Sequence, residues 1–190
     1  MPAFNSTTPN LNWAVNRLNH QGNIFTDLLK SLGASVDGLL NGFGSQANNI
    51  VIEYATSWAI QIANDNTHGY DQKNRQGPDY DCSSLVSNAY HKINGIDVNN
   101  STRTMRDNFK ANGFTEYPFN GFGECERGDV LWKTGHTAIY CGNNQLVEAN
   151  INEKGTTTGG RTGDQTGNEI RVTTAYSGWT YYLRFTGGND

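Results

Sequence analysis

The order of helix-like and strand-like segments is the feature that most constrains the fold of this chain. Apolar residues recur at helical spacing in segments 49–63 and 82–94, and a further helix is expected within 101–112. After Gly128 the pattern changes, and short segments typical of strands follow at 129–132, 136–141, 145–150, 169–174 and 179–185. Helices followed by neighbouring strands predict an α+β domain, in which N-terminal helices pack on an antiparallel β-sheet.

The first 48 residues differ in character from the rest of the chain. They are rich in Asn and contain one amphipathic stretch, Ile24–Leu40, which ends in the glycine-bearing segment 41–46. Such a segment predicts a boundary. We therefore expect a partly helical N-terminal appendage or linker over 1–48 and a single domain over 49–190. The apolar stripe could dock on that domain, bind a partner or be part of a longer parent chain, and we favour docking.

Charge and hydropathy exclude two classes of partner. The chain has 14 Lys and Arg against 18 Asp and Glu, with a net charge of -4 and no basic run, so nucleic acid is not an expected partner. No segment approaches the ~20 apolar residues of a membrane helix. Met1–Asn10 is polar and lacks the pattern of a signal peptide. We expect a protein made in the cytoplasm without a signal peptide, and no membrane partner.

Cysteine is present at three positions: Cys82, Cys125 and Cys141. An odd number without a CxxC pair indicates neither a disulfide framework nor a cysteine-based zinc site. Cys125 and Cys141 are expected to be packing residues. Cys82 lies where an apolar helix begins, and a helix N-terminus stabilises a thiolate. The position suits a nucleophile, although buried cysteines at helix ends are also common.

A β-hairpin is expected on the turn residues Gly142–Asn144. In a tight hairpin the numbers of paired residues have a nearly constant sum. Counting outward from position 143 pairs Ile139 with Val147 and Tyr140 with Leu146.

The same count predicts polar side chains near His136, the first residue of the first strand of the hairpin. Asn150 falls opposite His136, and Glu148 falls opposite Ala138. In the absence of a bulge, His136, Glu148 and Asn150 share one face of the sheet. His136 could take a proton from a thiol, or it could be an edge-strand histidine bonded to backbone. Either Glu148 or Asn150 could hold its second ring nitrogen, as a catalytic triad requires.

Three motifs carry a resemblance to a known family. The segments Gly77–Val86 (GPDYDCSSLV), Arg127–Trp132 (RGDVLW) and Gly135–Gly142 (GHTAIYCG) resemble the NlpC-type papain-like cysteine peptidases, most closely the bacteriophage peptidoglycan amidohydrolases. The resemblance covers about residues 50–185 and implies a papain-like (NlpC-type) fold. The implied activity is hydrolysis of an amide in bacterial peptidoglycan, as an N-acetylmuramoyl-L-alanine amidase or a stem-peptide endopeptidase.

The resemblance also implies roles for individual residues. Cys82 would be the nucleophile and His136 the base. Glu148, twelve places after the histidine, would orient the imidazole, and we place it ahead of Asn150. Tyr70, twelve places before the cysteine, would help to bind the oxyanion together with the amide at Cys82. The alternative for Tyr70 is a loop aromatic packed beside the helix.

The residues around Cys82 complete the expected site. Asp81 is expected to fix the start of the helix, and Ser83 is grouped with it near the substrate. Asp71, Asp79 and Asp81 cluster in sequence, but their spacing lacks the order of a calcium-binding loop. We expect no metal and no other cofactor.

The expected partner is bacterial peptidoglycan, and residues 1–48 could in addition contact a phage tail or a parent polypeptide. The protein would then be a phage-derived endolysin or tail-associated lysin, reaching the cell wall after release or within a phage particle. Two alternatives are a catalytically silent wall-binding or phage structural module of the same fold, and an acyltransferase that uses the same triad. The Gly- and Thr-rich loop Gly155–Asn168 is expected to be flexible and either to flank the substrate groove or to be an ordinary surface loop.

Overall fold

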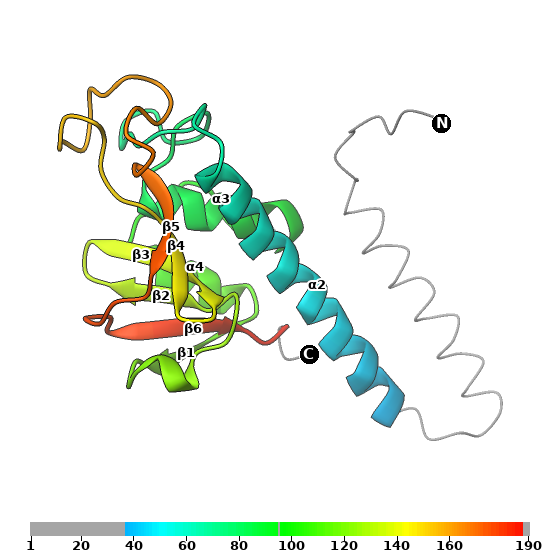
Figure 1. Ribbon diagram of the computed structural model, residues 1–190. Helices are drawn as coiled ribbons and strands as arrows, with labels where there is room; N and C mark the ends of the chain where they lie inside the picture. Colours follow the sequence, from blue (N-terminus) through cyan, green and yellow to red (C-terminus); the bar gives the residue numbers. More distant parts are fainter. Residues whose placement is uncertain (1–36, 95, 188–190) are drawn as a thin grey trace, which may run out of the picture. The chain divides into compact units, whose positions relative to one another are not determined.

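The computed structural model of the protein describes residues 37–94 and 96–187 (Figure 1). The chain forms two compact units, Met1–Ala47 and Asn48–Asp190, and the second contains the sheet and the candidate site. Most of the predicted amphipathic stretch Ile24–Leu40 lies outside the described residues. The account below concerns the second unit.

Helices α2 (Asp37–Ala63), α3 (Cys82–Asn94) and α4 (Met105–Ala111) are found close to the predicted helical segments. α2 begins earlier than predicted and includes the glycine-bearing segment 41–46, so the expected break in the helix is absent. Each helical glycine costs about 1 kcal/mol relative to alanine, which is a weak preference that neighbouring residues can outweigh. No helix in the described ranges is long and apolar enough to span a lipid bilayer.

A six-stranded antiparallel sheet follows the helices, in the spatial order β1-β6-β2-β3-β4-β5. The α+β class is therefore confirmed, and five of the six strands were predicted. β1 was missed because it is a short edge strand that mixes polar and apolar residues and ends in proline. The strands are β1 (Phe114–Pro118), β2 (Val130–Lys133), β3 (His136–Gly142), β4 (Gln145–Ala149), β5 (Ile170–Thr174) and β6 (Tyr181–Phe185).

The β3–β4 hairpin has the predicted register, with Ile139 opposite Val147 and Tyr140 opposite Leu146. Asn143 and Asn144 at its tip both have positive φ, 51° and 58°, as a type I′ turn requires. A register shift lies between Tyr140 and Gly142. Because this shift is on the turn side of the pairs, the alternation of faces expected from Ile139 towards His136 is unaffected by it.

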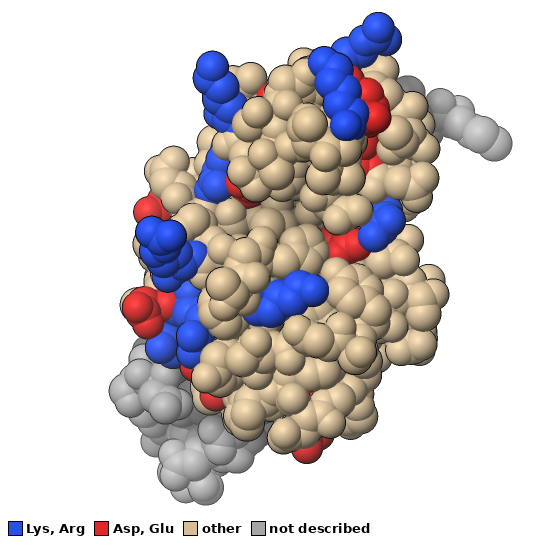
Figure 2. All heavy atoms as spheres, turned by 90° about the vertical axis from the view of Figure 1, so that its left-hand side faces the viewer, with Lys and Arg blue, Asp and Glu red and all other residues tan. Residues whose placement is uncertain are grey.

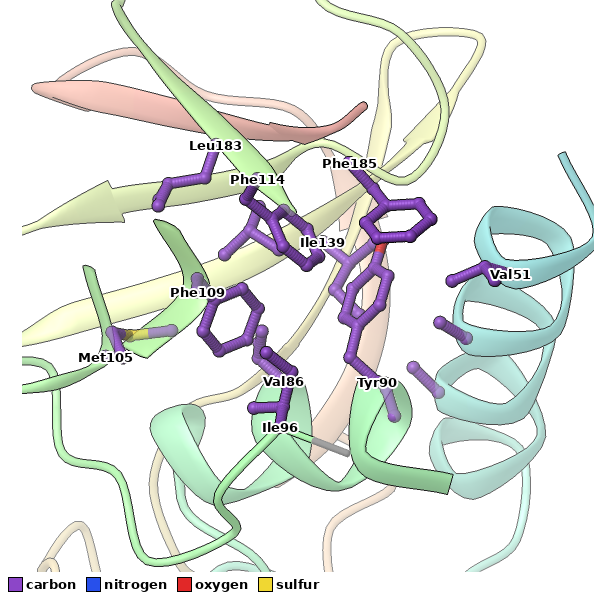
Figure 3. Close-up of a cluster of buried hydrophobic side chains, with 14 of the residues drawn as sticks. Val51, Val86, Tyr90, Ile96, Met105, Phe109, Phe114, Ile139, Leu183 and Phe185 are labelled. Carbon is purple, nitrogen blue, oxygen red and sulfur yellow. The ribbon is translucent and has the colours of Figure 1, made fainter. Parts of the chain in front are cut away.

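The main hydrophobic core lies between the helices and one face of the sheet (Figure 3). Side chains from α2, α3 and α4 meet side chains from β1, β2, β3 and β6 there, and Figure 3 shows the rings of Tyr90, Phe109 and Phe114 turned towards one another. An aromatic-rich cluster covers the other face. Its buried members are Leu131, Ala138, Tyr140, Leu146, Trp179 and Tyr182. The core fixes α3, and with it Cys82, against β3.

Gly128, just before β2, is a position that only glycine fits. Its φ is +90°, and a Cβ atom there would lie 2.5 Å from Ile52 Cγ2. The Gly128 carbonyl also accepts a hydrogen bond from the buried Tyr90 hydroxyl. The close approach of α2 and α3 to this turn sets where β2 begins.

Candidate active site

Cys82 is the first residue of α3, and Asp81 caps the helix in front of it. Asp81 Oδ1 accepts a hydrogen bond from the Ser84 backbone N–H at 2.7 Å, and Ser84 Oγ accepts one from the Asp81 backbone N–H at 2.9 Å. This reciprocal pair is a capping box, and a carboxylate at this end also complements the helix dipole. The run Asp-Cys-Ser-Ser therefore determines where the helix starts and where the cysteine lies.

Ser83, expected near the substrate, belongs to the same cap. Its Oγ donates to Asp81 Oδ1 at 2.9 Å and accepts from Arg75 Nη1 at 3.3 Å. Arg75 also pairs with Asp81 Oδ2 at 2.6 Å and bonds the Asn100 carbonyl. Asp81 and Ser83 are both buried. Their contacts therefore position the start of α3. Arg75 was missed because nothing in its sequence context marks it.

Cys82 is buried, with only 6% of the residue exposed. Burial, followed by the negative charge of Asp81, raises its pKa to about 12, while the backbone N–H groups of Thr137 and Ser83 partly offset the rise. The sequence led to the opposite expectation, a pKa lowered by the helix dipole. Desolvation of the thiolate outweighs the dipole, so the resting thiol is protonated and needs a base.

His136, the first residue of β3, is held on two sides. Its Nε2 lies 2.8 Å from Glu148 Oε2, and its ring stacks on the indole of Trp179 with the planes 21° apart. Among the described residues no hydrogen bond joins His136 to Cys82, but the next residue, Thr137, directs its backbone N–H to the sulfur. Since Glu148 occupies Nε2, Nδ1 is the ring nitrogen available for proton exchange with the thiol.

Glu148 is a buried carboxylate with a full set of partners. Oε2 accepts from His136 and, at 2.6 Å, from the Tyr176 hydroxyl. Oε1 accepts from Arg171 Nε at 3.0 Å and Nη2 at 2.8 Å. Burial alone would raise the pKa of Glu148, but the hydrogen bonds from these three side chains outweigh it and lower the pKa to about 2. Glu148 is therefore a fixed negative charge beside the imidazole at any working pH.

The two candidates for orienting His136 are thus separated by geometry. Glu148 is 1% exposed and contacts the ring, whereas Asn150 follows the last residue of β4 and is exposed. The Asn150 backbone N–H donates to the Glu169 carbonyl at 2.8 Å. Glu148 lies diagonally across from His136 in the hairpin, a separation that a long side chain can bridge. The spacing of twelve residues carried by the resemblance located the contact, while the hairpin count alone slightly favoured Asn150.

Arg171 and Tyr176 were missed as parts of the site. Arg171 is the direct cross-strand neighbour of Glu148 in the β4–β5 pair. The long loop between these strands hides that register from the sequence. Tyr176 and Trp179 come from the β5–β6 loop, and Lys133 lies over both rings, with Nζ 5.2 Å and 5.0 Å from their centroids. A loop with no defined turn pattern gives no sequence indication of where its aromatics point.

Tyr70 lies near the thiol with its hydroxyl already oriented. The Tyr70 hydroxyl oxygen accepts a hydrogen bond from Gln72 Nε2 at 3.0 Å. Burial raises its pKa to about 12, while the hydrogen bond from Gln72 offsets part of the rise. The hydroxyl is therefore protonated and keeps its proton for donation. The backbone N–H of Tyr70 donates to Glu169 Oε2 at 3.0 Å, which fixes the segment.

The three acidic residues considered for calcium serve separate structural purposes. Asp71 accepts backbone N–H groups of its own loop, and Asp79 Oδ1 accepts those of Gly69 and Gly163, each at 2.9 Å. Asp81 is occupied by the helix cap. In the part of the chain that the structure describes, no three His, Cys, Asp or Glu side chains are grouped to hold a metal ion.

The loop Gly155–Asn168 makes many hydrogen bonds, although its composition is typical of a flexible loop. Asp164 accepts hydrogen bonds from four backbone N–H groups, including that of Glu169. The Gln72 backbone N–H donates to the Thr157 carbonyl at 2.9 Å. Polar side chains therefore hold the loop against the segment that carries Tyr70.

Residues 66–174 match the NlpC/P60 family. The chain belongs to the NlpC/P60 family. The matched segment includes Tyr70, Cys82, His136, Glu148 and Arg171. The papain-like fold expected from the resemblance is that of this family and agrees with the α+β architecture described above. No curated protein matches the chain.

The NlpC/P60 domain is similar to several solved structures at low sequence identity. NlpC1 from Trichomonas vaginalis has 17% identity and a TM-score of 0.45, with 69% of this chain and 44% of that chain covered. The P60 domain of an antigen from M. avium subspecies paratuberculosis has 19% identity and a TM-score of 0.44, with 77% and 99% covered. The peptidoglycan hydrolase RipB from Mycobacterium tuberculosis has 17% identity and a TM-score of 0.40, with 97% and 88% covered. This chain therefore spans less than half of the length of NlpC1.

Proposed function

We propose that this NlpC/P60 protein is a cysteine amidohydrolase that cuts an amide bond in bacterial peptidoglycan. The family consists of cysteine peptidases that act on this polymer. The observation that carries the proposal is the contact between His136 Nε2 and the buried, ionised Glu148. That contact leaves the other ring nitrogen available, and the next residue, Thr137, directs its backbone N–H to the sulfur of Cys82 at the start of α3. A nucleophile, a base and an orienting group could act together from these positions.

In the proposed reaction Cys82 Sγ attacks the carbonyl carbon of the amide while His136 accepts the thiol proton. The high pKa of the resting thiol makes this transfer necessary, because little thiolate exists beforehand. The negative charge on the carbonyl oxygen would be stabilised by the Tyr70 hydroxyl and the Cys82 backbone N–H. His136 then donates the proton to the departing amine, the C–N bond breaks and a thioester remains. A water molecule deprotonated by His136 hydrolyses the thioester and restores the thiol.

Glu148 would act through the histidine rather than on the substrate. Its fixed charge stabilises the imidazolium that forms when His136 holds the proton, and its position selects the ring orientation. Arg171 and Tyr176 keep that charge in place. We assign both of them to positioning.

Two finer statements belong to the same proposal. The bond cut is either the N-acetylmuramoyl-L-alanine bond or a peptide bond within the stem. The motifs around Cys82 and His136 favour a phage-derived endolysin or tail-associated lysin, which meets the wall after release or within a phage particle. Contacts with a phage tail or a parent polypeptide would fall to residues 1–48, of which 1–36 lie outside the described residues.

The test is to identify the products formed from purified peptidoglycan. An amidase produces a new amine on L-alanine and a free lactyl carboxyl on muramic acid, whereas an endopeptidase produces new ends within the stem. Labelling of new amines followed by mass spectrometry distinguishes the two. An intact polymer after long incubation with folded protein would contradict the proposal and favour a silent module of the same fold. Products joined to an added amine in place of water would favour acyl transfer.

A further inference from the structure

A second feature lies beside the candidate active site, on the side of the β2–β3 turn. The structure contains a hollow of about 490 Å³ between the start of α4 and this turn. Gly135, which lines the hollow, immediately precedes His136, so the hollow begins within about 4 Å of the histidine backbone, the spacing of neighbouring Cα atoms. Its lining residues are Thr102, Arg103, Arg106, Asp107, Lys110, Trp132, Thr134 and Gly135.

One wall of the hollow is rigid and carries little unpaired charge. Arg106 makes two hydrogen bonds of 2.6 Å to the carboxylate of Glu116. Its guanidinium also lies 4.6 Å from the ring centroid of Trp132 and 4.1 Å from that of Tyr181. The Trp132 Nε1–H donates to the Thr102 carbonyl at 2.8 Å. These contacts hold the wall in shape before any ligand arrives, and they neutralise the charge of Arg106.

Arg103 differs from the other cations of the hollow. Lys110 lies 3.0 Å from Asp107 in an exposed pair. In the described residues the Arg103 side chain is exposed and has neither a hydrogen bond nor an ion pair. With Arg106 paired to Glu116 and Lys110 paired to Asp107, Arg103 leaves the hollow with one uncompensated positive charge. Arginine at such a position binds carboxylates through paired N–H donors.

The setting of the hollow suits a local anionic group better than a polyanion. On the face of the molecule in Figure 2, Lys and Arg side chains form separate groups rather than a continuous basic band. The chain as a whole carries a net charge of -4. A single carboxylate, on a substrate held at the neighbouring His136, matches the one uncompensated positive charge of the hollow.

We propose that this hollow is a substrate subsite, in which Arg103 binds a free carboxylate of the peptidoglycan stem peptide. The inference rests on the proposed function and adds a specificity determinant to it. Because the hollow adjoins His136, the carboxylate belongs to a residue close to the bond that is cut. Arg103 then distinguishes stems with a free acid at that position from stems in which it is amidated.

The test uses synthetic muropeptides in which each stem carboxylate in turn is replaced by a carboxamide. For the full-length protein, amidation at one position should raise KM about tenfold, since one charge-assisted hydrogen bond is lost at a partly exposed site. For the muropeptide with the free carboxylate, Arg103→Gln should raise KM by a similar factor and leave kcat within about twofold. The variant should also lose the preference for the carboxylate over the carboxamide substrate. Asp107→Asn should lower KM for the acid, because it removes the only carboxylate in the lining.

Arg161→Gln is the matched control, because it removes one exposed positive charge outside the hollow and should keep the acid preference. The subsite is overturned if Arg103→Gln changes the acid and amide substrates equally or not at all. In that case the proposed function stands, since cleavage itself is observed. Failure of the unmodified protein to cleave any of the muropeptides overturns the proposed function, and the subsite with it.

Discussion

At the scale of single residues, the candidate site depends on a buried carboxylate that stays ionised. Glu148 is 1% exposed, yet three side chains donate four hydrogen bonds to its two oxygens. A carboxylate has about four lone-pair positions, so each is occupied. One of the donors is His136, and the other two, Arg171 and Tyr176, hold the carboxylate where the imidazole needs it.

The first prediction separates Glu148 from Asn150. Glu148→Gln keeps the size of the side chain but removes the charge that stabilises the imidazolium, so kcat/KM should fall about 100-fold. Asn150→Ala should change kcat/KM by less than about twofold. A large loss of kcat/KM in Asn150→Ala, with little loss in Glu148→Gln, would show that Asn150 and not Glu148 orients the imidazole.

Tyr176→Phe tests whether the second donor acts through Glu148. Loss of the 2.6 Å hydrogen bond leaves one lone pair of a buried carboxylate without its partner, so the free energy of unfolding should fall by about 2 kcal/mol. The pH–rate profile should shift as well, which a purely structural residue would not cause. Tyr54→Phe is the control, because Tyr54 is only partly buried and lies on α2. If Tyr176→Phe and Tyr54→Phe change the stability and the pH–rate profile equally, Tyr176 has no specific role at Glu148.

At the scale of elements, the two proposed reacting groups each stand at the first residue of an element. The capping box starts α3 at Cys82, and the turn after β2 starts β3 at His136. Each of these starts is encoded locally, and the sequence predicted both. Contacts between distant elements were harder to predict. Arg171 contacts Glu148 across the β4–β5 pair, and the register of two strands joined by a long loop cannot be derived from the sequence. β1 was missed for a related reason, since an edge strand has only one neighbour to impose a pattern.

Loops and burial were predicted least well, because both depend on tertiary contacts. The loop Gly155–Asn168 looks flexible in composition but is held by Asp164 and by the segment that carries Tyr70. The helix dipole suggested a lowered pKa for Cys82, whereas burial raises it. The dipole can be inferred from one element, but desolvation requires knowledge of everything packed around the thiol.

Gly128→Ala tests how closely the elements pack at the start of β2. The new methyl group would meet Ile52 Cγ2 at 2.5 Å, and φ is +90°, so the free energy of unfolding should fall by about 3 kcal/mol. Gly167→Ala also has a positive φ, +71°, but open space around it, and should cost about 1 kcal/mol. Denaturant unfolding of both variants measures the difference. Equal losses would show that backbone strain, rather than the close packing, accounts for the requirement for glycine.

At the scale of the whole molecule, the proposed chemistry requires two parts of the chain that are far apart in sequence. The helical part supplies Cys82 and Tyr70, and the sheet supplies His136 and Glu148. Their relative placement follows from the shared core between the helices and one face of the sheet. Formation of the site and global folding should therefore be coupled.

Acid unfolding provides a measure of that coupling. The pKa of Glu148 is about 2 in the folded protein against an ordinary value of 4.5, so between these values the unfolded chain binds a proton that the folded protein does not. The stabilisation from this residue, about 3 kcal/mol, should be fully present above pH 4.5 and be lost as the pH falls towards 2. Thermal unfolding of Glu148→Gln should show a weaker dependence on pH in this window. Parallel curves for the two proteins would contradict the assigned charge state.

The most direct test of the central claim is the activity of Cys82→Ala on purified peptidoglycan, with its fold checked by circular dichroism and thermal unfolding. The substitution removes the nucleophile but leaves His136, Glu148 and Tyr70, so amide cleavage should fall to the background rate while the folded structure is retained. In the unmodified protein, acid quenching during turnover should trap the acyl part of the cleaved amide on Cys82 as a thioester, identified by mass spectrometry. A folded Cys82→Ala variant that releases the same products at the unmodified rate would contradict the account.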